Sequence, residues 1–331
     1  MIRKLFSNLA FLLTSLCLPQ AAAAQNGMLA PGSLIVYPLI DNSGTSQTWV
    51  TVTNTNLSSA SGTVRVNFAY INGSDCGELS RSKLLTPGDT LTVNTKLDNP
   101  NMTAGYLYVY ATTATSSAAI SFNHLIGTTR VINTATTTDM EYQPFVFPAI
   151  GAQGALTDLD NDTRRDFNNL EYAAVPNRLQ FPRFTGHYES LGTVGFARSS
   201  YIVLVSLAGS QFTNSVDFAI YNDNEEAFSA QTSFTCWTKR KLKDISTAFT
   251  HNFLLSTNHN ASESFNSRET GTFRINGRQA SSTGGTITDP AILALLIEEV
   301  STVGGDAVLP FAIGTQTNGD LLNTGSLPDT N

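Results

Sequence analysis

The chain has 331 residues, 14% of them charged, and its formal net charge at pH 7 is −7. An acidic chain of this kind does not attract a polyanion, so we expect no DNA or RNA partner. Because the charged fraction is low, neutral polar residues must form most of the surface, as they do in many secreted β proteins, whose strands carry Thr on the solvent face.

The first residues, Met1–Ala24, have the pattern of a cleavable secretory signal peptide. The basic residues Arg3 and Lys4 precede an apolar run, Leu9–Leu18, and small alanines then place the cleavage site before Gln25. The apolar run is too short to span a bilayer permanently, so we expect no transmembrane segment after cleavage. The predicted location is extracellular or on the outer cell surface, with the periplasm as the alternative.

The next segment, 28–150, predicts a β-sandwich domain. Runs rich in β-branched and aromatic residues follow each other about every ten positions, with turn residues between them. Several runs alternate apolar with polar residues, as expected of strands that have one face on the core. The runs are Ser33–Tyr37, Thr48–Val52, Val64–Phe68, Thr90–Val93, Tyr106–Tyr110 and Ala119–Phe122.

The same kind of run returns in the segment 179–321, which predicts a second β-sandwich domain. Val66–Asn72 aligns with Val216–Asn222 at an offset of 150 residues, which leaves open a tandem duplication or a chance match between β-rich sequences. An acidic linker, 151–178, is expected between the two domains, and a C-terminal tail, 322–331, after them. The runs of the second domain are Tyr201–Val205, Ser215–Ala219, Ser233–Trp237 and Gly271–Ile275.

One short helix is predicted near the C-terminus, over Ala291–Val300. Asp289 is a suitable capping residue, and Pro290 suits the first helical position. The segment is apolar on all sides, which is typical of a helix buried against a sheet.

These features predict an all-β fold class with two tandem β-sandwich domains and one short helix near the C-terminus. The strand spacing resembles that of the immunoglobulin-like sandwiches found on bacterial surface proteins. This resemblance implies a fold and assigns no functional residue.

The sequence lacks the common motifs of catalysis. It contains neither a Gly-x-Ser-x-Gly elbow nor a His-Glu-x-x-His metal helix. The histidines are scattered, which is more typical of surface or packing positions than of a catalytic base. They are His124, His187, His251 and His259. We therefore expect no enzyme, and a secreted hydrolase whose site is assembled from loops is the least favoured alternative.

The expected linker carries acidic residues at alternate positions, a pattern typical of calcium loops. Calcium takes roughly six to eight oxygen ligands, and the first, third, fifth and ninth residues of such a loop can supply them. Thr163 stands where the loop needs Gly, and Asn169 stands where it needs a closing Glu. The alternative is therefore a solvated linker whose arginines pair with its aspartates. The candidate calcium ligands are Asp158, Asp160, Asp162 and Asp166.

Two cysteines, Cys76 and Cys236, remain after the predicted signal cleavage. An exported protein meets an oxidising environment, where such a pair most often forms a disulfide. We predict this disulfide, which requires that the fold bring the two Cα atoms within bridging distance.

A basic run follows Cys236 in this acidic chain and starts beside one of its two tryptophans. It is a candidate site for an anionic glycan or a lipid headgroup, and tryptophans can stack on sugar rings. The favoured interpretation is structural, since lysines on an edge strand prevent aggregation and tryptophans in strands, Trp49 included, are usually core anchors. The candidate ligand-binding residues are Trp237, Lys239, Arg240 and Lys241.

We expect an exported, non-catalytic structural or adhesive component of the cell surface or extracellular matrix. Its expected partners are other surface or matrix proteins, or further copies of itself. The alternative is a carbohydrate-binding module that holds polysaccharide on exposed aromatic residues, assisted by calcium at the Asp158 loop. No other cofactor is expected. Buried tryptophans would count against the alternative.

Overall fold

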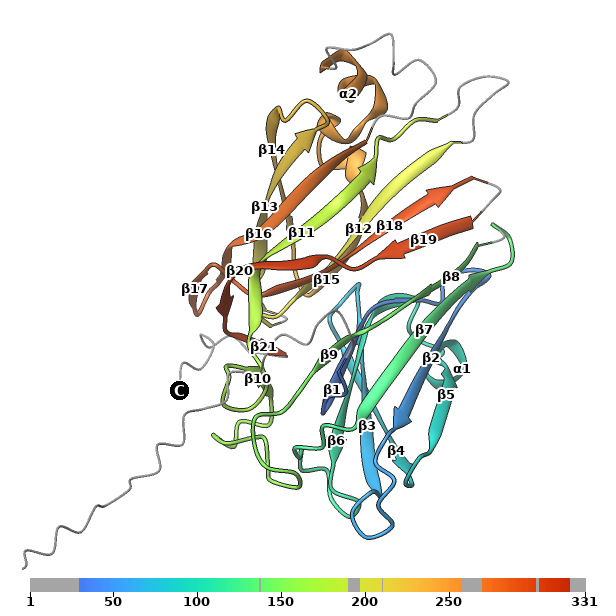
Figure 1. The fold of residues 1–331 in the computed structure, drawn as a ribbon, viewed down its shortest axis with the longest axis vertical. Coiled ribbons are helices and arrows are strands. Elements are labelled where there is room, and N and C mark those ends of the chain that lie inside the picture. Colours follow the sequence, from blue (N-terminus) through green and yellow to red (C-terminus); the bar gives the residue numbers. More distant parts are fainter. Residues whose placement is uncertain are drawn as a thin grey trace, which may run out of the picture. The chain divides into compact units, whose positions relative to one another are not determined.

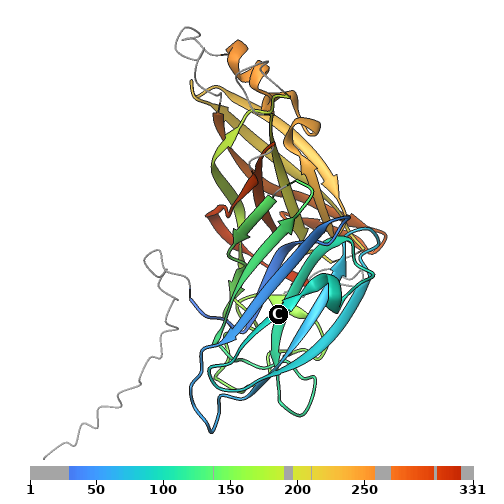
Figure 2. The same cartoon turned by 90° about the vertical axis from the view of Figure 1, so that its right-hand side faces the viewer.

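The computed structural model describes residues 30–136, 138–189, 197–209, 211–257, 270–301 and 304–321. The predicted signal peptide and C-terminal tail lie outside the described residues. From Pro31 onward the described chain belongs to one unit that is nearly all β, built from several antiparallel sheets (Figures 1 and 2). The predicted all-β class is therefore confirmed. None of the described helices is long and apolar enough to cross a membrane.

Strands β1 to β9 form two antiparallel sheets over a common core. Sheet I has the strand order β5-β2-β7-β8, and sheet II has the order β4-β3-β6-β1-β9. Val50 of sheet I packs in one apolar cluster with Ile35 and Phe68 of sheet II, so this part is sandwich-like. The bounds are β1 Leu34–Asp41, β2 Ser46–Asn54, β3 Val64–Asn72, β4 Glu78–Leu85, β5 Thr90–Asn94, β6 Ala104–Thr112, β7 Leu125–Asn133, β8 Thr138–Tyr142 and β9 Phe145–Phe147.

Strands β11 to β20 form two further sheets. Sheet III has the order β15-β12-β18-β19, and sheet IV has the order β14-β13-β16-β11-β20, with β17 paired to β16. Ile202 of sheet III shares an apolar cluster with Phe218 and Phe273 of sheet IV. The bounds are β11 Val175–Thr185, β12 Arg198–Ser206, β13 Thr213–Asn222, β14 Ala227–Phe234, β15 Trp237–Lys241, β16 Thr270–Ser282, β17 Gly285–Thr288, β18 Ile292–Val300, β19 Gly304–Val308 and β20 Phe311–Thr317.

The two pairs of sheets repeat one strand order. Taken along the chain, and leaving out β17, each strand of sheets I and II has a counterpart at the same place in sheets III and IV. The aligned segments Val66–Asn72 and Val216–Asn222 lie in the counterpart strands β3 and β13. The sequence match at an offset of 150 residues therefore falls on topologically equivalent strands.

The first strand of each set also breaks its register at the same place. The pairing of β1 with β6 shifts between Tyr37 and Ile40, and the pairing of β11 with β16 shifts between Phe181 and Phe184. A proline follows Tyr37 and another follows Phe181. Proline lacks the N–H that a ladder hydrogen bond needs, so an irregularity at both positions is expected.

The helices are short and follow counterpart strands. Helix α1 follows β5, and the helical turns η1 and η2 and helix α2 follow β15. Asn94 caps α1, because its side-chain oxygen accepts hydrogen bonds from the backbone N–H groups of Lys96 and Leu97. The bounds are α1 Thr95–Asp98, η1 Leu242–Asp244, η2 Thr247–Phe249 and α2 His251–Thr257.

Sheet III is buried on both faces. Ile202 and Leu204 of β12 point into the core shared with sheet IV. The alternate residue Val203 packs instead with Leu39 of β1 and Tyr142 of β8. Sheet III therefore also provides a contact between the two sets of sheets, and its central strands β12 and β18 carry the continuous apolar runs Ile202–Val205 and Ile292–Ile297 for that reason.

The predicted helix over Ala291–Val300 is wrong, because Ile292–Val300 forms strand β18. This strand lies between β12 and β19 in sheet III. Leu296 faces the core shared with sheet IV, and Leu293 faces the opposite side. A strand buried on both faces loses the alternation that identifies a strand, so its sequence resembles that of a buried helix.

The segment 151–178, expected as an acidic linker, contributes buried residues to the fold. It contains strand β10, Arg165–Phe167, which pairs with β21, Gly319–Leu321. Phe167 and Tyr172 are fully buried. Of the predicted runs before this segment, Ala119–Phe122 makes isolated bridges instead of a strand. The domain boundaries stay a prediction.

Candidate binding surfaces

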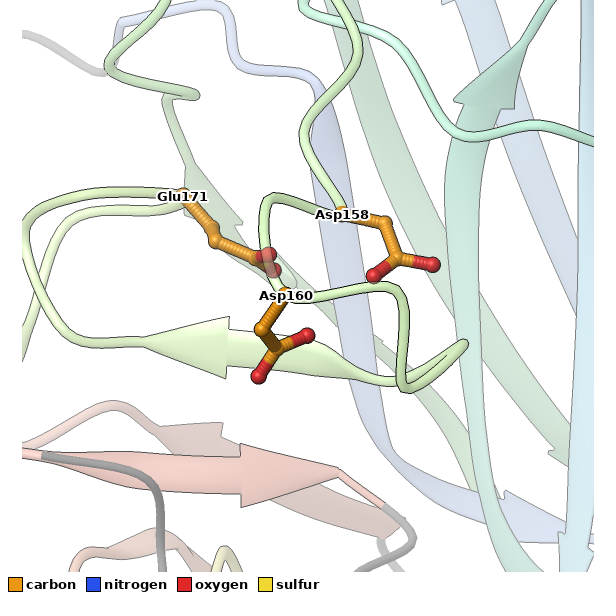
Figure 3. Close-up of side chains that lie close together, drawn as sticks. All are labelled: Asp158, Asp160 and Glu171. Carbon is orange, nitrogen blue, oxygen red and sulfur yellow. The ribbon is translucent and has the colours of Figure 1, made fainter. Parts of the chain in front are cut away.

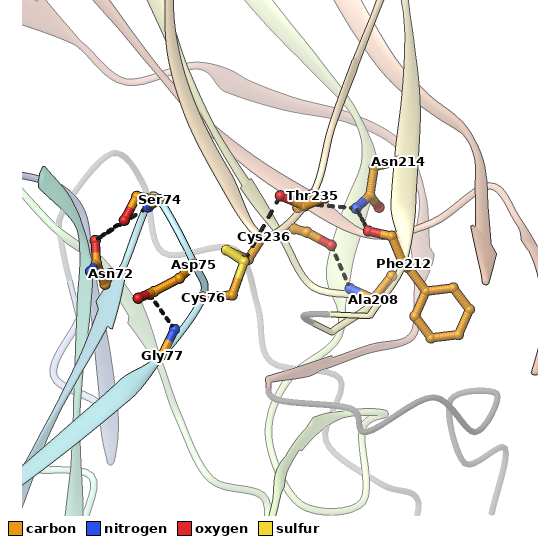
Figure 4. Close-up of a disulfide and its surroundings, with 11 residues drawn as sticks. Asn72, Ser74, Asp75, Cys76, Gly77, Ala208, Phe212, Asn214, Thr235 and Cys236 are labelled. Atoms are coloured by element: carbon orange, nitrogen blue, oxygen red, sulfur yellow. Dashed lines mark hydrogen bonds between the residues drawn. A yellow bond between two sulfur atoms is a disulfide. The ribbon is translucent and has the colours of Figure 1, made fainter. Parts of the chain in front are cut away.

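Cys76 and Cys236 form a disulfide, as predicted (Figure 4). Their Cα atoms are 6.0 Å apart, a separation common in protein disulfides. Cys76 lies in the turn between β3 and β4, and Cys236 lies between β14 and β15. The bridge therefore joins the first set of sheets to the second.

Trp237 lies beside this bridge and is half-buried. Its indole Nε1 donates a hydrogen bond of 2.8 Å to the backbone oxygen of Pro38. Its ring lies against the turn after β3, where a Cβ on Gly73 would come within 2.3 Å of the ring atom Cε3. Through these contacts Trp237, the first residue of β15, packs against β1 and against the turn after β3.

The basic residues of the predicted ligand site lie on β15, an edge strand of sheet III. The Lys239 ammonium lies 3.7 Å from a carboxylate oxygen of Glu299 and 5.0 Å from the ring centroid of Tyr201. The Lys241 ammonium lies 5.7 Å from the same ring, and Arg240 donates to a hydroxyl of β14. Each charge has a partner within the chain, as expected of edge-strand residues that block aggregation. Their role in ligand binding stays a prediction.

Two of the four predicted calcium ligands meet in an acidic cluster. Carboxylate oxygens of Asp158, Asp160 and Glu171 lie within 4.8 Å of one another. Asp158 and Asp160 belong to one loop, and Glu171 reaches toward it from farther along the chain (Figure 3). Burial raises the pKa of Glu171 to about 7, although the backbone N–H groups of Leu159 and Asp166 donate hydrogen bonds to it.

The other two predicted ligands lie outside this cluster. Asp162 pairs with Arg164 at 3.1 Å. Asp166 is buried in β10, directly opposite Asp320 of β21. Glu171 was not among the predicted ligands because it does not occupy a loop position of the calcium pattern, and only the fold brings it close. Three carboxylates at this spacing suit a hard cation such as calcium, and calcium binding stays a prediction.

One histidine faces a hydroxyl group. His187 Nδ1 lies 3.1 Å from Ser199 Oγ, and burial lowers the pKa of His187. Its Nε2 lies 3.9 Å from Glu189, beyond hydrogen-bond distance, and the Glu189 side chain is 83% exposed. A base oriented by an exposed carboxylate at this distance lacks the fixed geometry of a catalytic triad.

Two of the remaining histidines pack against aromatic rings, and the third lies outside the described residues. The His124 ring packs edge-on against Phe122, and the buried His251 packs against Tyr188. His259 lies outside the described residues. That this protein is not an enzyme stays a prediction.

Sheet I has an outer face with one aromatic residue, Trp49. The residue is 37% exposed, so the expectation that both tryptophans are core anchors does not hold for Trp49. Trp49 pairs with Asn94 of β5 on one side and with Arg130 of β7 on the other, and Glu141 of β8 continues the row. Directly paired residues share a face, so the row crosses the whole sheet.

Threonines form the next row on this face. Thr51 pairs with Thr92 and with Thr128, and the hydroxyl oxygens of Thr51 and Thr92 are 3.2 Å apart. Trp49, these threonines and Arg130 line a shallow hollow of about 340 Å³. We call this surface the Trp49 face. It combines one aromatic ring with a row of hydroxyl groups.

The alternation of apolar and polar residues in β2 was a signal for this surface. Val50 and Val52 are fully buried, so the residues between them and before them, Thr51 and Trp49, must point the other way. The sequence pattern thus placed Trp49 on the polar face, whereas the usual burial of tryptophan favoured the core.

Comparisons with known proteins give only weak similarity, and only to solved structures. No protein family and no curated protein matches the chain. Among solved structures, the empty particles of cowpea mosaic virus are similar at 10% identity over 97% of this chain and 100% of theirs, with a TM-score of 0.17. The structure of broad bean stain virus is similar at 12% identity over 95% of this chain and 100% of that chain, with a TM-score of 0.18. An anti-sigma factor domain-containing protein gives 9% identity over 89% and 84%, with a TM-score of 0.14. Similarity at this level carries no argument about fold or function.

Proposed function

We propose that this chain is an exported, non-catalytic adhesive protein that binds polysaccharide on the Trp49 face. The observation that carries the proposal is the exposed residue Trp49 beside threonine hydroxyls on the outer face of sheet I. An exposed indole supplies a large apolar surface at little cost in conformational entropy, and its flat shape suits the C–H face of a sugar ring. The surrounding hydroxyls and Arg130 supply hydrogen bonds to sugar hydroxyls.

The comparison with the counterpart sheet supports this proposal. Tyr201 is the fourth residue of β12, as Trp49 is of β2. Tyr201 lies beside Val203 and Val205, which are fully buried in the contact between the two sets of sheets. No described residue covers Trp49 in this way. A packing role therefore accounts for Tyr201 and leaves Trp49 unexplained.

We also propose that the two sets of sheets are tandem immunoglobulin-like sandwiches that arose by duplication. Their common strand order, the aligned strands β3 and β13, and the register break beside a proline in β1 and β11 support a duplication. An adhesive protein gains reach and surface from such a repeat. Other surface or matrix proteins and further copies of the chain remain proposed partners.

Export supports this function and rests on the Met1–Ala24 pattern alone. An extracellular or outer-surface location would bring the Trp49 face to polysaccharides outside the cell. The disulfide between Cys76 and Cys236 suits an oxidising compartment. The acidic cluster at Asp158 lies in the segment between β9 and β11, whereas Trp49 lies in β2. We therefore propose that calcium acts by stiffening the segment between the two sets of sheets.

The test is a glycan array followed by affinity electrophoresis in β-glucan, xylan, mannan and galactan. We expect the purified mature chain to bind at least one of these polymers, and Trp49→Ala to weaken that binding about thirtyfold or more. Leu57→Ala is the matched control, because Leu57 is 81% exposed, follows the end of β2 and does not line the hollow at Trp49. The proposal fails if no polysaccharide binds, or if Trp49→Ala binds as the control does.

A further inference from the structure

The outer face of sheet IV carries a concentration of arginines in an otherwise acidic protein. A shallow hollow of about 690 Å³ lies on this face. The charged residues that line it are Arg178, Arg274, Arg278 and Asp217, three cations against one anion. The whole chain has a net charge of −7, so this face differs in sign from the average surface.

Strand register explains why these side chains meet. Arg178 of β11 pairs with Asn276 of β16, which pairs with Asp217 of β13. In the next row Arg274 pairs with Ala219 of β13. Directly paired residues share a face, so the arginines of two strands lie around the small side chain of Ala219. The small residue leaves the floor of the hollow open between the guanidinium groups.

The guanidinium groups are only partly engaged by the protein. In the part of the chain that the structure describes, Arg178 makes no side-chain hydrogen bond or ion pair. Arg274 uses Nε to donate to Gln180 at 2.6 Å, and Arg278 lies 3.7 Å from Asp217. Guanidinium groups bind carboxylates in a planar, two-pronged geometry, and free N–H groups on a shared face favour an anionic ligand.

Aromatic rings flank the arginines on both sides. The Arg274 guanidinium lies 5.8 Å from the ring centroid of Tyr221 in β13. Across the sheet, Phe311 of β20 pairs with Gln180 of β11 and is 64% exposed. Three strand spacings separate β13 from β20, which is about 14 Å. A ligand that contacts both rings must therefore be an extended molecule, and its charges must fall between them.

We infer that the outer face of sheet IV is a second binding surface, for the carboxylate groups of an acidic polysaccharide. The flanking rings of Tyr221 and Phe311 contact sugar rings, and Arg178 and Arg274 pair with carboxylates between them. This surface lies on a different sheet from Trp49, so it goes beyond the proposed function and does not depend on it. The net positive charge excludes a preference for the uncharged polymer.

The test compares polygalacturonate with neutral galactan in calorimetric titrations of the purified chain. We expect polygalacturonate to bind more tightly than galactan, and its binding to weaken with added salt. Arg178→Gln and Arg274→Gln should each lower the affinity for polygalacturonate about threefold to fivefold, and the double variant about tenfold. Arg81→Gln is the matched control, since Arg81 is exposed on β4 of sheet II.

Several outcomes would overturn this inference. It fails if the Trp49→Ala chain binds galactan as tightly as polygalacturonate, or if the arginine variants behave like Arg81→Gln. It also fails if dextran sulfate binds and polygalacturonate does not, because the site would then select sulfate groups. Trp49→Ala should leave polygalacturonate affinity unchanged. A loss in Trp49→Ala with no loss in the arginine variants would assign the binding to the Trp49 face and contradict the second surface.

Discussion

The indole Nε1 of Trp237 donates a hydrogen bond of 2.8 Å to the backbone oxygen of Pro38, which lies 199 residues earlier in the chain. Pro38 belongs to β1 of sheet II and Trp237 to β15 of sheet III. The bond adjoins the disulfide of Cys236, so one small region carries both a covalent and a polar link between the two sets of sheets. This region should control how the two sets unfold.

Trp237→Phe should lower the free energy of unfolding by about 1–2 kcal/mol, because the Pro38 oxygen loses its donor while most of the ring packing is kept. Trp237→Ala should cost about 3–5 kcal/mol, since it also removes the ring. Urea denaturation followed by circular dichroism measures both values. Equal stabilities of the two variants would contradict a separate contribution from ring packing.

Gly73→Ala should destabilise the chain by about 1–3 kcal/mol, because the added Cβ would lie 2.3 Å from Trp237 Cε3. Gly77→Ala in the same turn is the control. The atoms nearest to its Cβ would be those of the Asp75 side chain, from 3.1 Å, and this side chain can move. Thermal melts of the two variants measure their melting temperatures. A larger drop for Gly77→Ala than for Gly73→Ala would show that the contact between residue 73 and Trp237 does not determine the loss of stability.

Removal of the disulfide should lower the free energy of unfolding by about 3–5 kcal/mol. The bridge closes a loop with a sequence separation of 160 residues, so its loss frees a long segment in the unfolded state. The double variant Cys76→Ser and Cys236→Ser should melt at a lower temperature than the wild type. The melting temperature of the double variant should not respond to a reducing agent, whereas that of the wild type should fall.

Asp320 should make stability depend on pH. Burial, and then the charge of Asp166, raise the pKa of Asp320 from 3.8 to about 8. The folded state therefore binds more protons than the unfolded state between these values, and stability falls as the pH rises through this window. This loss of stability is absent below the pKa of Asp320 in the unfolded chain, 3.8, and complete above its pKa in the folded chain, about 8.

Asp320→Asn removes this titration and should be more stable than the wild type at pH 9 by on the order of 3 kcal/mol. The difference should shrink toward pH 4. Chemical denaturation at a series of pH values measures it. Parallel pH profiles for the two chains would show that Asp320 does not carry the effect.

Calcium should raise the melting temperature if Asp158, Asp160 and Glu171 bind it. The rise should be larger at pH 8 than at pH 6, because the pKa of Glu171 is about 7 and calcium needs the ionised carboxylate. Asp160→Ala should abolish the rise, and Asp223→Ala, in an exposed turn, should not. No response of the wild type to millimolar calcium at pH 8 would favour the solvated acidic segment.

Strand positions could be predicted from the sequence because they depend on local patterns. β2 and β13 alternate buried with less buried residues, and this alternation is visible in their sequences. Cys76 and Cys236 are the only cysteines after the predicted cleavage site, so the sequence allowed one pair, and the fold brings its Cα atoms within 6.0 Å. The strand β18 was predicted as a helix because residues far away in the sequence cover its second face, so it is apolar on both faces and shows no alternation.

The candidate surfaces depend on contacts across strands and were less visible. Glu171 joins Asp158 only through the fold, and Arg178 meets Arg274 only because β11 pairs with β16. Trp49 was visible by alternation, but the usual burial of tryptophan outweighed that signal. Sequence patterns within one strand predict which face a residue occupies, whereas burial of that face is decided by distant elements.

A bound polysaccharide should cover Trp49, and acrylamide quenching of tryptophan fluorescence tests this contact most directly. In the Trp237→Phe chain, Trp49 is the remaining tryptophan and is exposed to the quencher. We predict that saturation with a polysaccharide bound by the wild-type chain lowers the quenching constant. An unchanged quenching constant while the polysaccharide is bound would place the ligand elsewhere and contradict the account.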